Sequence, residues 1–136
     1  MVSDRCKTLN KRLLGTTASF YKEEDQEMRW YQNLYVGTNA MPHIQAIRRK
    51  AASGRLMAGV YYITRASVPG NLLDIFHNGM LKQNYFAKTQ CTDVIGVAEG
   101  RMEAYRLAEQ VIWEVYQKTG GFDIGSYFRS EDFVED

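Results

Sequence analysis

Cysteines are scarce in this chain, and it has no long run of apolar residues. The 136 residues include two cysteines, Cys6 and Cys91, which lie far apart and form no Cys-x-x-Cys pair. This spacing favours neither a disulfide framework nor a zinc knuckle, and we expect two reduced thiols. The longest uncharged apolar stretch, "LMAGVYYIT" at residues 56–64, is far shorter than the ~20 residues that a membrane helix needs.

The amino-terminal residues offer helix signals but no apolar segment of signal-peptide length. The sequence therefore predicts a cytoplasmic protein. Its composition, 45% hydrophobic and 24% charged, is typical of a globular chain about the size of one domain. Ser3 and Ser19 can each cap a helix, so we expect a helical arm at residues 1–29 and a single small α/β domain at residues 30–136.

Recognisable catalytic and metal-binding motifs are also missing. Cys91 has no base near it in the sequence, and a thiolate nucleophile would need His43 or His77 to reach it through the fold. No His-x-x-x-His pair occurs, and the two histidines lie far apart. We therefore expect no metal and no cofactor, and the residues favour a protein that is not an enzyme.

The stretch "DVIGVAEGRMEA" at residues 93–104 joins a strand to a helix through two glycines, as many phosphate-binding loops do. Its spacing, Gly96-x-x-x-Gly100, fits neither the Walker pattern nor Gly-x-Gly-x-x-Gly. Glu99 and Glu103 flank the helix start and would repel a phosphate. Because the helix dipole stabilises carboxylates there, a structural role explains both glutamates, and only Arg101 argues for an anion site.

The order of predicted elements indicates the fold class. Short β-prone runs occupy residues 33–37, 56–64 and 93–98, and each precedes a helical pattern, the clearest of which spans residues 101–119. Leu72, Leu73, Ile75 and Phe76 suggest the apolar face of a brief helix. This alternation predicts an α/β domain with a small, mostly parallel sheet of about three strands packed by helices. A split arrangement with one antiparallel strand is the alternative.

Acidic residues are absent from residues 28–73, a stretch that holds six basic ones. Five of these six define the partner-binding site that we expect, because clustered arginines suit a nucleic-acid backbone or an acidic protein surface. The competing interpretation is a solvated helix face with charges that do not converge. The expected partner-binding residues are Arg48, Arg49, Lys50, Arg55 and Arg65.

Several stretches between residues 30 and 128 resemble a family of small uncharacterised bacterial proteins from anaerobic gut bacteria. They include "WYQNLYVG", "VIGVAEGRMEA" and "VYQKTGGFDIGSYF". The resemblance implies a bacterial, cytoplasmic accessory protein with an α/β core, and it implies no activity and no catalytic residue. Residues 1–29 fall outside the resemblance, and as an added arm they could help a partner or a second copy dock.

The sequence is compatible with three functions. The favoured one is a non-enzymatic bacterial accessory protein that binds another macromolecule, with a protein partner preferred. The second is a nucleic-acid-binding protein that uses the basic residues between positions 48 and 65. The third is a small enzyme with no recognisable motif.

Overall fold

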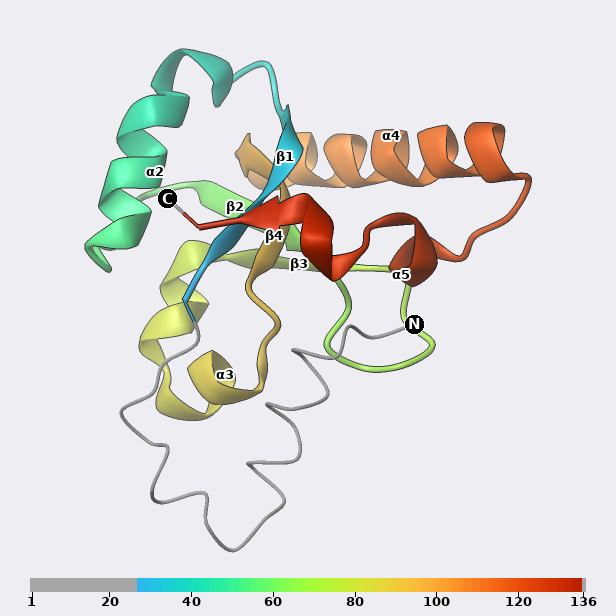
Figure 1. Ribbon diagram of the computed structural model, residues 1–136. Coiled ribbons are helices and arrows are strands. Elements are labelled where there is room, and N and C mark those ends of the chain that lie inside the picture. Colours follow the sequence, from blue (N-terminus) through green and yellow to red (C-terminus); the bar gives the residue numbers. More distant parts are fainter. Residues whose placement is uncertain (1–26, 136) are drawn as a thin grey trace, which may run out of the picture.

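A single mixed sheet of five strands, in the order β3-β2-β4-β1-β5, organises the computed structural model (Figure 1). The structure describes residues 27–135. The central strand β4 pairs in parallel with β1 and antiparallel with β2, while β3 and β5 form the edges. The strands are β1 (Arg29–Val36), β2 (Val60–Thr64), β3 (Asp74–His77), β4 (Asp93–Glu99) and β5 (Phe133–Val134).

The expectation of a small, mostly parallel sheet of about three strands is wrong. Among the hydrogen-bonded strand pairs of the described residues, β1–β4 is the parallel one, whereas β1–β5, β2–β3 and β2–β4 are antiparallel. The main reason is β3, whose residues were expected in a brief helix. Ile75 and Phe76 instead pair with Ile63 and Tyr62 of β2 after the chain turns back near Gly70, so this connection is a long hairpin.

Helices cover both faces of this sheet (Figure 1). The long helix α4 and the short α5 pack on one face, and α2 with the η3–α3 segment covers the other. The helical segments are η2 (Met41–His43), α2 (Ile44–Ala52), η3 (Asn78–Lys82), α3 (Asn84–Thr89), α4 (Arg101–Thr119), α5 (Ile124–Tyr127) and η4 (Ser130–Asp132).

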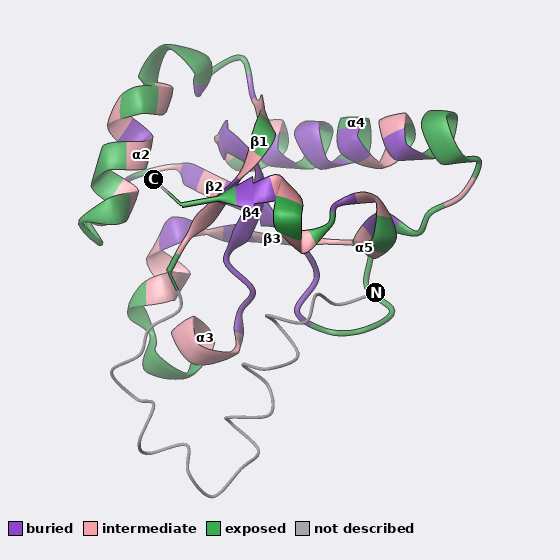
Figure 2. Ribbon diagram, viewed as in Figure 1, coloured by how far each residue is buried: buried purple, intermediate pink, exposed green. Residues whose placement is uncertain are grey.

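Strand β4 contributes to a hydrophobic core on each face. Ile95 and Ala98 pack toward α4, while Val94 and Val97 pack toward α2. Figure 2 shows the result, with buried residues along β4 and on the inner side of α4. Gly96 permits this close packing, because a Cβ atom there would lie only 3.1 Å from a methyl carbon of Leu107 on α4.

The predicted arm at residues 1–29 lies outside the described residues up to position 26. Within the described part, Arg29 already belongs to strand β1. None of the helices at residues 27–135 is long and apolar enough to cross a lipid bilayer.

Candidate functional site

The glycine-containing junction between β4 and α4 is filled by the protein's own carboxylate. Glu103 accepts hydrogen bonds from the backbone N–H groups of Asn39, at 2.7 Å, and Glu99, at 2.9 Å. It also lies against Gly37, where a Cβ atom would collide with the carboxylate. A phosphate at the start of α4 would have to displace this negative charge. The geometry therefore supports the structural role that the sequence indicated for Glu103.

The cysteine and histidine candidates do not come together. Cys91 is wholly buried and disulfide-bonded, so the expectation of a reduced thiol at this position is wrong; Cys6 lies outside the described residues. His43 lies on the surface, 3.3 Å from the Glu99 carboxylate, and His77 accepts the backbone N–H of Gly79. Across residues 27–135 no group of three metal-ligating side chains occurs.

Four of the five expected partner-binding residues lie together along α2 and just beyond its end. Arg49, Lys50 and Arg55 are exposed. Arg48 is half-buried, and its guanidinium lies 4.9 Å from the centre of the Trp30 indole ring. The helix forms as expected, with Ile47 buried against the sheet, so the cations project to its outer and flanking sides.

Arg65 does not join this group, because it is buried. Only 4% of its side chain is exposed, and its Nη1 atom lies 3.3 Å from a carboxylate oxygen of Asp93. Asp93 is wholly buried and also accepts two hydrogen bonds from Arg29, at 2.7 and 2.8 Å. This Arg29–Asp93–Arg65 network ties the starts of β1 and β4 to the end of β2. Arg65 therefore has a role inside the protein.

Two lysines that were not predicted from the sequence extend the basic group. Lys82, at the end of η3, donates a hydrogen bond to the backbone carbonyl of Gly54, just after α2. Lys88 lies in the last turn of α3. The helical segments α2, η3 and α3 contain no aspartate or glutamate. We define the basic surface as Arg48, Arg49, Lys50, Arg55, Lys82 and Lys88.

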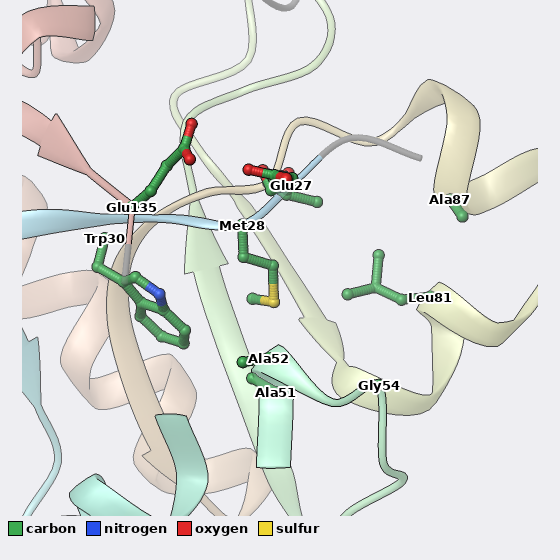
Figure 3. Close-up of a pocket in the computed structure, with 10 residues that line it drawn as sticks. Glu27, Met28, Trp30, Ala51, Ala52, Gly54, Leu81, Ala87 and Glu135 are labelled. Atoms are coloured by element: carbon green, nitrogen blue, oxygen red, sulfur yellow. Dashed lines mark hydrogen bonds between the residues drawn. The ribbon is translucent and has the colours of Figure 1, made fainter. Parts of the chain in front are cut away.

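A pocket of about 450 Å³ opens between α2 and the η3–α3 segment (Figure 3). Figure 3 shows the side chains of Met28 and Leu81 extending into it from two sides, with the Trp30 ring beside Met28. Ala51 and Ala52 contribute the α2 wall. These apolar groups give the pocket a hydrophobic interior directly next to the basic surface.

Polar groups at the pocket are few. The carboxylates of Glu27 and Glu135 lie on the side where β1 begins and β5 ends (Figure 3). Thr92 is buried, and its hydroxyl donates a hydrogen bond to the backbone carbonyl of Glu27 at 3.0 Å. The pocket thus has an apolar interior with two carboxylates at its edge. The basic surface adjoins it through Arg48, which contacts the lining residue Trp30, and Lys82, which contacts the lining residue Gly54, an arrangement suited to binding an amphipathic segment.

The sequence does contain a signal for Lys82 and Lys88. They lie well after residues 28–73, so a count along the chain missed them. The signal is the lack of acidic residues in each helical segment on one face of the sheet, but it can be used only when α2, η3 and α3 are known to share that face.

Comparison of the chain with protein-family models, curated proteins and solved structures gave no match.

Proposed function

We propose that this chain is a non-enzymatic accessory protein that binds an acidic segment of another protein. In this proposal the cations of the basic surface pair with partner carboxylates, and an apolar partner side chain enters the pocket between α2 and η3. The resemblance found in the sequence adds a bacterial, cytoplasmic setting to the proposal.

The observation that carries the proposal is the charge of one helical layer. Five cations lie on α2, η3 and α3, a sixth follows α2, and these helical segments contain no aspartate or glutamate. Arginine presents a planar fork of donors that matches a carboxylate in two-point fashion. Arg49 and Arg55 are exposed and so available for such pairing.

The pocket favours a protein over a nucleic acid. Met28, Leu81 and Ala51 give it an apolar lining, which suits a leucine-sized or aromatic side chain. Glu27 and Glu135 at its rim would repel a continuous phosphate backbone. A polypeptide, unlike a phosphate backbone, can place an apolar group, acidic groups and basic groups at separate positions.

An enzyme without a recognisable motif is a weaker candidate for the same pocket. Catalysis there would need convergent polar groups with a base in reach of a nucleophile or a water molecule. Among residues 27–135, the polar side chains at the pocket are the carboxylates of Glu27 and Glu135 and the hydroxyl of Thr92, which already donates to a backbone carbonyl.

Site-specific photo-crosslinking tests the proposal. The photoreactive residue benzoylphenylalanine replaces exposed Ala52 beside the pocket, and in a matched control it replaces exposed Ser126 of α5 on the opposite face. Both proteins are irradiated in cells of the native host, and crosslinked products are identified by mass spectrometry. We expect a discrete protein adduct only at Ala52. No adduct, or the same adduct at both positions, would contradict the proposal.

The salt dependence of the binding affinity then distinguishes a protein partner from a nucleic-acid partner. If about four cations neutralised phosphates, the logarithm of affinity would fall with the logarithm of salt concentration at a slope of about −3 to −4. A protein partner should give a shallower slope. Crosslinking of nucleic acid at Ala52 together with the steep slope would support the nucleic-acid alternative instead.

A further inference from the structure

The outer face of α4 carries large apolar side chains that remain exposed among the described residues. Met102, Tyr105, Trp113 and Tyr116 are 60%, 51%, 56% and 39% exposed. Successive residues of an α-helix are 100° apart, which places all four within one stripe opposite the buried side of the helix. Large contiguous apolar surfaces are rare on proteins that have no partner there.

Two aromatic members of this stripe, Trp113 and Tyr116, stack on each other. The rings of Trp113 and Tyr116 are stacked with centroids 5.9 Å apart, and the ring of Phe122 stacks on Tyr116 at 4.9 Å. Phe122, which follows the helix, is itself 55% exposed. A stack held in one arrangement before binding loses little side-chain entropy on association, which favours an interface.

The stripe has a symmetric spacing about Glu109. Met102 and Tyr116 each lie seven residues from Glu109, and Tyr105 and Trp113 each lie four residues from it. An isologous interface requires a surface that matches itself after a two-fold rotation. A helix face with its apolar residues at equal distances on either side of its centre meets this requirement when two copies pack antiparallel.

We propose that the chain forms a two-fold symmetric dimer in which α4 of one copy packs antiparallel on α4 of a second copy, with the axis at Glu109. In that register Met102 of each copy lies level with the second copy's Tyr116, and Tyr105 lies level with the second copy's Trp113. Each apolar group of the stripe then meets another apolar group.

Charge on the same face agrees with this register. Arg106 and Glu109 are both exposed, and within residues 27–135 neither makes an ion pair. Across the two-fold axis, Arg106 lies three residues from the level of the second copy's Glu109, an offset of about 4.5 Å measured along the helix axis. The two Glu109 carboxylates at the axis thus each gain a cation from the opposite copy.

The oligomeric state of the full chain, measured by sedimentation across a concentration series, is the first test. We expect a reversible dimer, and Trp113→Ala should weaken its association at least about tenfold, as loss of a central aromatic anchor does. Because Trp113 is exposed, this variant should keep its circular dichroism spectrum. A monomer at every concentration, or an unchanged dimer in the variant, would overturn the proposal.

The register has its own test. A cysteine-specific reagent with a short spacer should link two copies of Glu109→Cys, whereas two copies of Met102→Cys should stay unlinked, because antiparallel pairing separates those positions by about 21 Å. Linking at Met102 would indicate parallel pairing and would refute the proposed axis. Glu109→Arg should weaken the dimer, and adding Arg106→Glu should restore it.

Discussion

The guanidinium group of Arg48 lies over the indole ring of Trp30, 4.9 Å from the ring centre. Trp30 is buried and lines the pocket, while Arg48 belongs to the basic surface. One contact therefore joins the apolar pocket to the cations beside it and holds α2 against the start of β1. A partner that uses both features would engage them as one continuous surface.

Removing the charge of Arg48 should destabilise the protein slightly. In Arg48→Met the apolar stem is kept and the cation–π contact with Trp30 is lost, so the free energy of unfolding should fall by about 0.5–1 kcal/mol. Arg49→Met, on the exposed side of the same helix, serves as the control and should change it by less than about 0.5 kcal/mol. Urea titration measures both, and equal effects would contradict a specific role for the Arg48–Trp30 contact.

Loss of the Asp93 charge should be far more damaging. Asp93 is wholly buried between Arg29 and Arg65, so Asp93→Asn leaves two guanidinium groups without their shared carboxylate. Breaking a buried pair in this way costs about 3–5 kcal/mol. In Glu131→Gln, which removes an exposed ion pair with Arg129, the loss should be about 0–1 kcal/mol. Chemical denaturation distinguishes these outcomes, and a mild effect of Asp93→Asn would mean that the network contributes little.

Glu103 and Gly37 should show coupled effects on stability. Glu103→Ala leaves the backbone N–H groups of Asn39 and Glu99 without their acceptor and should cost about 1–3 kcal/mol. Gly37→Ala should destabilise because its new methyl group collides with the Glu103 side chain. In the double variant that collision is gone, so the combined loss should be smaller than the sum of the two single losses. Simple additivity would contradict the contact.

The hydrogen bond from the Tyr35 hydroxyl to Glu114, at 2.8 Å, should make stability depend on pH. The bond lowers the pKa of the Glu114 carboxyl, while burial followed by this bond raises the pKa of the Tyr35 phenol. The stabilisation by Glu114 is therefore complete above its unfolded pKa of about 4.3 and is lost as pH falls through its lower folded pKa. The stabilisation by Tyr35 is complete below its unfolded pKa of about 10 and is lost as pH rises through its raised folded pKa.

Tyr35→Phe removes the Tyr35 hydroxyl and its hydrogen bond to Glu114, while the hydrogen bond from Gln110 to Glu114 remains. The difference in the free energy of unfolding between the natural chain and Tyr35→Phe should be largest between about pH 5 and pH 9 and should shrink on both sides. Denaturation at a series of pH values gives this difference directly. A difference that stays constant from acid to alkaline pH would show that the bond does not couple the two titrations.

Local sequence signals predicted some elements well. Helix α4 occupies residues 101–119 as its apolar spacing indicated, and Gly120 ends it in the left-handed conformation. The strand signals at residues 56–64 and 93–98 correspond to β2 and β4. In each of these segments the local preference agrees with the tertiary packing.

Other elements depend on contacts between distant residues and were missed. The apolar residues from Leu72 to Phe76 are compatible with a short helix and with a strand. Ile75 and Phe76 lie in β3 because they pair with β2. Strand β5 has two residues and exists because β1 offers it an edge. The burial of Arg65 likewise follows from Asp93, which is 28 residues away in the sequence.

The exposed apolar stripe on the outer face of α4 is visible in the sequence but was not predicted from it. Tyr105, Trp113 and Tyr116 follow the same helical period as the buried residues, shifted to the opposite side. Recognising the exposed stripe required counting apolar residues on both sides of the helix.

Charge reversal on the basic surface tests the central claim most directly. Arg49→Glu with Arg55→Glu should weaken binding of the partner captured at Ala52 at least about tenfold, since several carboxylates would then face like charges. Arg101→Glu with Lys118→Glu, which alters the net charge equally on exposed positions of α4, should bind the partner as the natural chain does. Calorimetry on all three proteins, with melting temperatures nearly unchanged, would support the account. Equal weakening by both pairs, or full binding by the Arg49–Arg55 variant, would contradict it.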